Sequence, residues 1–538
     1  MEQILEKNIS RSSVHSWIYF LCLCLLVLSI PTSGPFIFIS QALLIINWLA
    51  EGQLKFKFKK FFSNKPALIF ASIFFIHLVS LLWTDNLLKG LSSELLTKLP
   101  ILTLTLVIVT SPPLDIKKIR IILFLFIATV LTVSFIGFHI YITRDITDFR
   151  HLAPYASHLY LSLMLIISAF LLPWLTKQVT QNYGWLITSF ALSAWMIFFL
   201  MLTRTLSGLV SLTGVLIFFI LWIIVNHKNV VFKISTAFIF ITVIVLSLWG
   251  LNYMHNLVTH KVETDLTSLN QYTNEGNPYY HDTTRTLREN GHFAYIYISE
   301  KELKNEWNKK SEIDYYGQDK LDQDVRYTLF RYMASKGLRK DKEHFKELTK
   351  SDIRAIEEGK TNHLYKNWPG ILIRVHQAMM GIQKYRETND PTWGSFTQRI
   401  DLWGASYQAF KKKPLIGWGI GDIYEAVQYG LAKNNSELQG KQMKPHNQYL
   451  IILLTLGSLG LILFLVFYIY TVIKTKAYTL FPFNIIIVTF AVDMTGNNPI
   501  DAQFGLTMFV FFTLYFGFIY PNKSNCQNFN KKSTQTNN

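Results

Sequence analysis

Long apolar blocks alternate with short polar connections along two stretches of the chain, residues 1–251 and 448–520. A helix needs about 17 to 25 mostly apolar residues to cross a hydrocarbon core of about 30 Å, because its backbone amides must bond within the segment. About twelve blocks reach or approach this length, and they predict an all-α multi-pass membrane protein with about twelve transmembrane helices. The blocks are residues 17–30, 35–50, 67–83, 99–109, 121–142, 157–175, 185–202, 206–225, 234–251, 448–473, 481–494 and 504–520.

Basic residues in the short connections predict how these helices are oriented. With the amino terminus in the cytoplasm, all of the basic connections fall on the cytoplasmic face, as the positive-inside rule requires. They carry Lys55, Lys57, Lys59, Lys60, Lys65, Lys117, Lys118, Arg120, Lys228, Lys233, Lys474 and Lys476, and the carboxyl-terminal tail adds Lys523, Lys531 and Lys532. No small-residue cleavage site follows the first block, so we expect it to be a retained anchor rather than a cleaved signal sequence.

The segment 252–447 is hydrophilic, and a structureless loop of this length is improbable. We therefore expect a large, mainly helical subdomain outside the cytoplasm, although no motif assigns a role to residues 252–385. The predicted organisation is a membrane domain of about nine helices over residues 1–251, this extracytoplasmic loop subdomain over 252–447, a membrane domain of about three helices over 448–520, and a cytoplasmic tail over 521–538. Cys22 and Cys24 lie in the first apolar block and Cys526 in the tail, so no disulfide is expected in the subdomain.

Composition agrees with a membrane protein. Half of the 538 residues are apolar and 16% are charged, against roughly a quarter in ordinary soluble domains. The formal net charge of +17 is explained by topology and solubility, and we expect contacts with membrane lipids and none with nucleic acid.

Several short patterns resemble known sites but lack the necessary context. Gly417, Gly419 and Gly421 follow no buried strand, so a tight turn is favoured over a dinucleotide site. Asp322 and Asp324 have a spacing used for divalent metals, but a solvated surface is the favoured interpretation. Neither an HExxH zinc pattern nor a GxSxG nucleophile pattern is present. We expect no metal and no cofactor.

Polar residues at the outer ends of predicted spans are the first site candidates. Arg204 lies between two apolar blocks with almost no loop, where an arginine either snorkels to the interface or serves a function. Arg150 and His151 precede His158 at the start of the next span, and Asp493 lies near the end of another. For His158 and Asp493, structural hydrogen bonding and catalysis are equally supported.

A second set lies where the hydrophilic segment meets the apolar block 448–473. His446 and Asn447 stand directly before that block, and Lys411, Lys412 and Lys413 form a basic run upstream. Asn447 could orient the imidazole or cap the following helix. The lysines could attract an anionic lipid or act as a plain interfacial anchor.

His446, Asn447 and Arg204 belong to motifs that resemble the signature of the O-antigen ligase and polymerase superfamily. The resemblance covers roughly residues 150–250 and 395–515, and the segment 252–385 is longer than expected of a typical ligase. The motifs are Gln398-Arg399-Ile400-Asp401-Leu402-Trp403, Pro414-Leu415-Ile416-Gly417-Trp418-Gly419-Ile420-Gly421, His446-Asn447-Gln448-Tyr449-Leu450, Leu456-Gly457-Ser458-Leu459-Gly460-Leu461, and Arg204 with Ser207-Gly208.

The resemblance implies a metal-independent glycosyltransferase of the bacterial inner membrane, with both termini in the cytoplasm and its active site on the periplasmic face. Such an enzyme moves a glycan from an undecaprenyl-diphosphate carrier to an acceptor. We expect Arg204 and Arg399 to bind the diphosphate, because guanidinium groups stay charged and can bind phosphate oxygens bidentately. His446 is the candidate general base, and one histidine with two arginines and no obvious nucleophile favours inverting displacement.

Four functions remain as alternatives. An O-antigen ligase that attaches polysaccharide to lipid A-core is favoured, while a surface polysaccharide polymerase and a protein O-oligosaccharyltransferase would share its donor and motifs. A lipid-linked oligosaccharide transporter can also have about twelve spans, but here the chain shows no matching halves and its polar candidates lie at one face.

Overall fold

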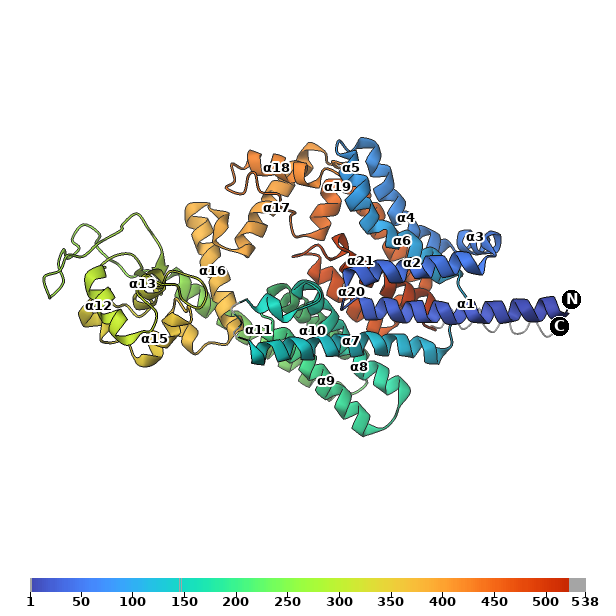
Figure 1. The fold of residues 1–538 in the computed structure, drawn as a ribbon, viewed down its shortest axis with the longest axis horizontal. Helices are drawn as coiled ribbons and strands as arrows, with labels where there is room; N and C mark the ends of the chain where they lie inside the picture. The colour runs from blue at the N-terminus through green and yellow to red at the C-terminus, as the bar shows by residue number, and fades with distance from the viewer. Residues whose placement is uncertain (1, 145, 147, 522–538) are drawn as a thin grey trace. The chain divides into compact units, whose positions relative to one another are not determined.

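The computed structural model describes residues 2–144, 146 and 148–521, and the predicted tail with Cys526 therefore lies, except for residue 521, outside the described residues. The chain folds into two compact units. The first, called the helical unit, contains Met1–Asn226 and Arg399–Asn538, and the second, called the insert unit, contains His227–Gln398. Both units are mostly helical (Figure 1).

The amino-terminal segment of the helical unit contains ten α-helices and three short helices of other types. They are α1 (Glu2–Ser29), α2 (Gly34–Glu51), α3 (Leu54–Ser63), α4 (Lys65–Val79), η1 (Ser80–Trp83), α5 (Leu87–Lys89), η2 (Gly90–Leu95), α6 (Leu96–Thr110), α7 (Ile116–Thr143), η3 (Phe149–Leu152), α8 (His158–Val179), α9 (Tyr183–Leu202) and α10 (Leu206–Asn226).

Its carboxyl-terminal segment begins within α17, a helix that starts at the end of the insert unit. The elements are α17 (Ser395–Lys412), α18 (Ile423–Lys433), α19 (Gln448–Thr475), η6 (Ala477–Thr479), α20 (Phe481–Asp493), η7 (Pro499–Asp501), α21 (Gln503–Leu514) and η8 (Tyr515–Ile519).

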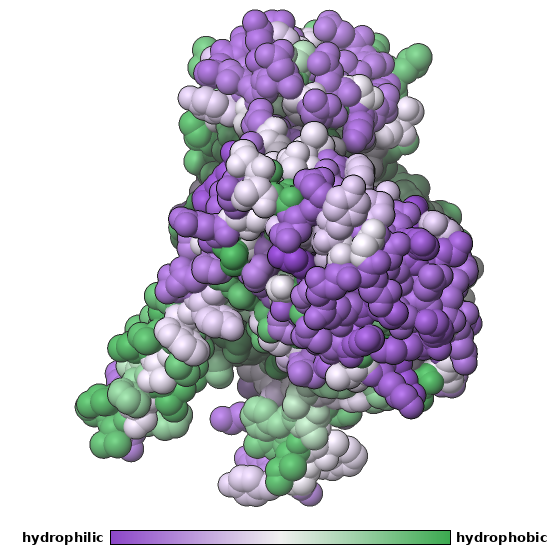
Figure 2. Space-filling view, turned by 90° about the vertical axis from the view of Figure 1, so that its left-hand side faces the viewer, coloured by the Kyte–Doolittle hydropathy of each residue, from purple (hydrophilic) through white to green (hydrophobic). Residues whose placement is uncertain are grey.

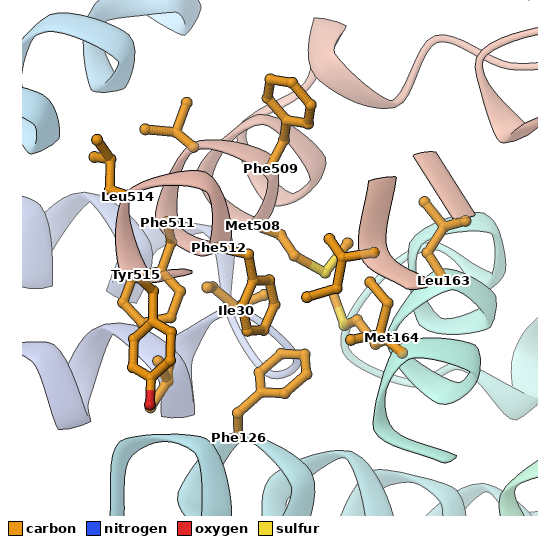
Figure 3. Close-up of a cluster of buried hydrophobic side chains, with 14 of the residues drawn as sticks. Ile30, Phe126, Leu163, Met164, Met508, Phe509, Phe511, Phe512, Leu514 and Tyr515 are labelled. Carbon is orange, nitrogen blue, oxygen red and sulfur yellow. The ribbon is translucent and has the colours of Figure 1, made fainter. Parts of the chain in front are cut away.

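Apolar side chains from helices far apart in the sequence form the core of the helical unit. Figure 3 shows Phe512 of α21 beside Ile30, the residue after α1, and Met508 of α21 beside Met164 of α8. Phe512 meets Phe126 of α7 edge to face, with 5.1 Å between ring centroids. The last apolar block of the sequence is thus a central helix of this unit.

Nine helices among the described residues are long and apolar enough to cross a membrane. Three shorter apolar helices, Ser13–Ser29, Phe481–Asp493 and Gln503–Ile519, could complete a set of twelve, which stays a prediction. The block expected at 99–109 belongs to a longer helical stretch, Leu87–Thr110. The first half of this stretch was not predicted as part of a span because it contains the charged residues Glu94 and Lys98. In the structure both side chains are buried and form ion pairs.

The insert unit has its own apolar core, built around Trp307, Tyr315, Tyr332 and Phe345. Its helices are α11 (Val230–Thr259), α12 (Glu300–Lys310), α13 (Val325–Ser335), α14 (Lys342–Phe345), α15 (Lys350–Glu357), η4 (His363–Lys366), α16 (Gly370–Thr388) and η5 (Pro391–Trp393). The strands β1 (Arg288–Glu289) and β2 (His292–Phe293) form a short antiparallel pair. Figure 2 shows a mostly hydrophilic surface over the region that contains α12, α13 and α15.

The two units meet in the sequence at residues 226/227 and 398/399, and α11 is grouped with the insert unit rather than with the helices before it. No residue of the 18-residue apolar window of α11 is buried, so this predicted span is not covered by other described parts of the protein on any side. The boundaries predicted at residues 251 and 447 refer to the membrane and stay predictions.

Candidate functional site

The loop of residues 444–447, which contains the predicted histidine, is held by hydrogen bonds on both sides of that histidine. The Pro445 carbonyl accepts a hydrogen bond of 2.8 Å from the indole N–H of Trp403. Asn447 caps α19, since its side-chain oxygen accepts a bond from the Leu450 amide at 3.1 Å. The capping alternative is therefore realised, and its amide group also donates to the Thr495 carbonyl at 2.9 Å.

His446 itself has a left-handed backbone conformation, with φ of 49°. Such a conformation costs energy in a residue other than glycine and persists where the surrounding contacts enforce it. The loop contacts supply that constraint, together with the Gln448 amide, which donates to the Met494 and Asn497 carbonyls, each at 2.9 Å. The imidazole is thereby presented from a rigid loop directly before α19.

Arg399 lies near His446 and contacts the segment that follows α20. One terminal nitrogen of its guanidinium donates to the side-chain oxygen of Asn497 at 3.2 Å, and Asn497 donates in turn to Asp493 at 2.7 Å. The side-chain amide of Asn497 thus bridges Asp493 and Arg399 by hydrogen bonds. The Arg399 Nε is buried and has no hydrogen-bond partner among the described residues. A buried donor of this kind is rare in native structures and is suited to an anionic ligand.

The electrostatic environment of His446 favours the neutral imidazole. Burial lowers its pKa below the usual 6.5, the charge of Arg399 lowers it further, and a hydrogen bond with Asn498 acts in the opposite direction. His446 precedes the candidate membrane span Gln448–Thr475, so these effects act in the loop. A neutral imidazole at neutral pH can accept a proton.

A buried four-charge cluster adjoins this loop. The Lys444 ammonium lies 3.0 Å from Glu94 and 2.5 Å from Asp501, and Lys98 lies 2.9 Å from the other oxygen of Asp501. Burial alone would raise the pKa of Asp501, but Lys98 and Lys444 hold it well below its usual range. The cluster ties the histidine loop to η7 and to the stretch Leu87–Thr110.

The glycine-rich turn packs into a break in α19. Gly457 interrupts the helix with φ of 68° and ψ of −173°. Trp418 and Gly419 donate their amides to the carbonyls of Leu454 and Thr455 at 2.7 and 3.0 Å. Ser458 and Leu459 donate to the Pro414 and Leu415 carbonyls at 2.8 and 3.1 Å. The turn thus satisfies backbone groups that the break in this candidate span leaves open.

Close backbone approach explains the glycines of that turn. Gly417 has φ of 73°, and a Cβ there would lie 2.6 Å from the Gly457 amide nitrogen. Gly421 donates its amide to the Thr84 hydroxyl at 2.9 Å, and Asp422 accepts bonds from the Asp85 and Asn86 amides at 2.7 and 2.9 Å. The expected tight turn is present.

Arg204, the other predicted arginine, stacks on an aromatic ring. Its guanidinium carbon lies 3.6 Å from the ring centroid of Phe149, and its φ is 52°. It lies two residues before α10, which runs antiparallel to α20, because Gly214 meets Val492 and Trp222 meets Phe481. The ends of these two helices therefore bring Arg204 to the same side of the helical unit as the segment after Asp493.

The remaining candidates have other neighbours. Arg150 is exposed and lies 3.7 Å from Asp148, while His158 is the first residue of α8. The ammonium groups of Lys411, Lys412 and Lys413 lie over aromatic rings of Tyr407, Tyr429 and Trp418, at 4.9, 4.2 and 4.8 Å respectively. The contacts described above thus bring together His446, Arg399, Asn447 and Asp493 of the predicted set.

Sequence reasoning missed four residues of this site: Lys444, Asn497, Asn498 and Asp501. Two features of the sequence could have indicated them: the polar residues that follow Asp493, and the lysine directly before the Pro-His-Asn sequence. Asp322 and Asp324 lie elsewhere, in the insert unit, where Asp324 caps α13 and pairs with Arg326 at 2.6 Å. The described residues contain no group of three or more histidine, cysteine, aspartate or glutamate side chains that could hold a metal ion.

Comparison with known families places the histidine loop within a family match. Residues 368–465 match the family described as O-antigen ligase, and this stretch contains Arg399, the three lysines, His446 and Asn447. No curated protein matches the chain. The match agrees with the motifs around His446, and through residues 368–465 it supports a place for this membrane protein in the O-antigen ligase superfamily.

Proposed function

We propose that this protein transfers a glycan from undecaprenyl diphosphate to an acceptor on the periplasmic face of the bacterial inner membrane. The observation that carries the proposal is that His446, in the loop before α19, lies near Arg399 of α17, a partly buried arginine whose buried Nε has no hydrogen-bond partner among the described residues. Ligation of polysaccharide to lipid A-core is the favoured reaction. It is consistent with a family match that implies glycan and lipid-linked substrates.

The diphosphate leaving group explains the need for arginines. When the bond between the anomeric carbon and the phosphate oxygen breaks, negative charge grows on that oxygen, and preorganised cations lower the barrier. Arg399 can direct its open Nε and its remaining terminal N–H groups at the diphosphate, and Arg204 supplies a second guanidinium. Lys411, Lys412, Lys413 and Arg150 would attract the anionic carrier from the membrane surface.

His446 supplies the other half of the reaction. It takes the proton from an acceptor hydroxyl as that oxygen bonds to the anomeric carbon, and undecaprenyl diphosphate leaves. Asn447 fixes the loop that carries His446, and Asp493 orients Arg399 through Asn497. His158, at the start of α8, would contact the glycan. No step requires a metal or a cofactor.

A single displacement inverts the anomeric configuration. Reconstituted protein should therefore turn a donor of known configuration into a product of the opposite linkage, as measured by NMR of the product. Retention would rule out the single-displacement mechanism and require an enzyme nucleophile.

Deletion of the gene distinguishes the acceptor classes. Carrier-linked polymer that accumulates beside bare lipid A-core indicates a ligase, and single repeats on the core indicate a polymerase. Unmodified proteins with normal lipopolysaccharide indicate a protein O-oligosaccharyltransferase. Purified protein that moves lipid-linked glycan across vesicles without joining it to anything would identify a transporter instead.

A further inference from the structure

The helix α3 has a stripe of apolar side chains that the described residues of the protein leave exposed. Leu54, Phe58 and Phe62 recur every four residues and so share one face of the helix. They are 39%, 42% and 62% exposed. We call these three residues the α3 stripe. Bulky apolar side chains lined up on a surface helix usually mark a contact with another molecule or with a membrane.

α3 is held firmly in place by its opposite side. Lys57 is buried, where its ammonium lies 2.8 Å from Glu51 and 2.5 Å from the Trp48 carbonyl. Phe61 packs in a small apolar cluster with Ala67 and Ala71 of α4. These contacts fix the rotation of the helix, so the stripe faces outward in the folded protein.

Chain continuity tells what surrounds α3. The candidate span α2 ends at Glu51, and the candidate span that begins with α4 starts at Lys65. A ten-residue helix between them is therefore tethered at both ends to membrane helices (Figure 1). It must lie at the boundary between hydrocarbon and water, where apolar side chains can enter the bilayer and charged ones can reach the headgroups.

Charge selects the kind of lipid. Lys55 and Lys59 are exposed on α3, and Lys65 is exposed directly after it. Lysines at a membrane surface attract anionic headgroups. We propose that α3 is a binding surface for anionic phospholipids, in which the α3 stripe enters the acyl boundary and Lys55 and Lys59 bind headgroup phosphates. The proposal is independent of the glycosyl-transfer site.

Nitroxide labels at two positions of α3 test its placement in the bilayer. In a full-length protein whose cysteines are replaced by serine, Phe62→Cys and Lys59→Cys are labelled separately and reconstituted into vesicles. Phe75→Cys in α4 is the lipid reference, and Tyr280→Cys in the insert unit is the aqueous reference; both positions are exposed. Accessibility to oxygen and to a water-soluble nickel complex is measured for each label.

The label at position 62 should resemble the lipid reference, and the label at position 59 should be more accessible to nickel. A label at position 62 that is as accessible to nickel as the aqueous reference would overturn the proposal. Protection of position 62 with strong dipolar broadening between labels would also overturn it, because that result would mean that a second copy covers the stripe.

Spin-labelled lipids test the charge selection. Wild-type protein should immobilise more phosphatidylglycerol than phosphatidylcholine, and Lys55→Gln with Lys59→Gln should bring the ratio closer to one. Lys346→Gln with Lys350→Gln, at exposed positions of the insert unit, is the matched control and should leave the ratio unchanged. An equal fall in both double variants, or in neither, would contradict a specific role of α3.

Discussion

Two partly buried arginines, one in each unit, differ in their hydrogen-bond partners. In the insert unit, two guanidinium nitrogens of Arg331 donate to Glu289 at 2.8 and 2.7 Å, and Asn362 donates to the other oxygen of that carboxylate at 2.9 Å. In the helical unit, Arg399 meets an amide oxygen at 3.2 Å and has a buried Nε with no partner among the described residues.

The difference separates a structural charge from a charge that is available for a ligand. A carboxylate neutralises Arg331, so removing either partner leaves an uncompensated buried charge. The hydrogen-bond chain from Arg399 reaches a carboxylate, that of Asp493, only through Asn497, so most of the arginine's positive charge remains available. Both arginines add to the net charge equally, and only their surroundings distinguish them.

The largest effect is expected at the site itself. Arg399→Ala and His446→Ala should each reduce glycan transfer by at least about 10²-fold, because a general base typically contributes 10²- to 10⁴-fold and charge stabilisation a similar amount. Transfer is measured with reconstituted protein and a lipid-linked donor. Arg354→Ala, at an exposed position of the insert unit, is the control. Near-normal transfer by either site variant would remove that residue from the mechanism.

Arg331→Met should instead act on stability. It leaves the fully buried Glu289 carboxylate without its cation, and breaking a buried pair costs about 3 to 5 kcal/mol. Limited proteolysis within residues 227–398 measures the loss. The double variant Arg331→Met with Glu289→Leu should recover much of the resistance. If Arg399→Met destabilised its own unit as much as this, the contrast between the two arginines would fail.

Lys444 tests whether the buried ion cluster positions the histidine. Lys444→Met should lower kcat by up to about 10²-fold, since displacing a reacting group by about 1 Å can cost that much. Lys444→Arg should restore part of the rate, and KM for the donor should change less than kcat. A rate that stays at the wild-type level with Lys444→Met would assign the cluster to stability alone.

The dependence of transfer on pH tests the effect of Arg399 on the pKa of His446. Because burial and Arg399 lower the pKa of His446, kcat/KM should hold at neutral pH and fall only when acidification below 6.5 protonates the imidazole. Asn498→Ala removes a hydrogen bond that raises this pKa, so its acid limb should move to lower pH. Asn498→Asp should move the limb upward. Limbs that do not move would mean that His446 does not limit the rate.

The smallest effect is expected from chelators. If side-chain cations stabilise the diphosphate, EDTA should leave the rate of transfer unchanged. The assay is transfer by the reconstituted protein with EDTA, followed by addition of Mg²⁺ or Mn²⁺. Loss of activity that either metal restores would direct attention back to Asp322 and Asp324.

Much of the site was readable from local patterns. A histidine and an asparagine directly before an apolar block predicted a helix start, and Asn447 does cap α19. The glycine triplet without a preceding strand predicted a turn, and Gly417 and Gly419 adopt positive φ. These inferences succeeded because they depend on a few consecutive residues.

Other features depended on partners far away in the chain. The apolar pattern missed the first half of the stretch Leu87–Thr110, because Glu94 and Lys98 are charged and their partners lie some 350 and 400 residues later. The side of α17 that is buried also depends on a distant partner: its fully buried residues include Ala405 and Ala409, while Tyr407 is 58% exposed. The close approach of α18, where a Cβ on Gly430 would clash with Ala405, explains that choice.

The sequence by itself predicted a helical membrane protein and the motifs around Arg399 and His446, because hydropathy, charge and helix caps act over short stretches. Tertiary structure alone decided that His446 and Arg399 lie together, that Asn497 separates Arg399 from Asp493, and that Lys444 is neutralised. These relations join residues far apart in the chain, and only packing determines whether a charge is paired or left open to a substrate.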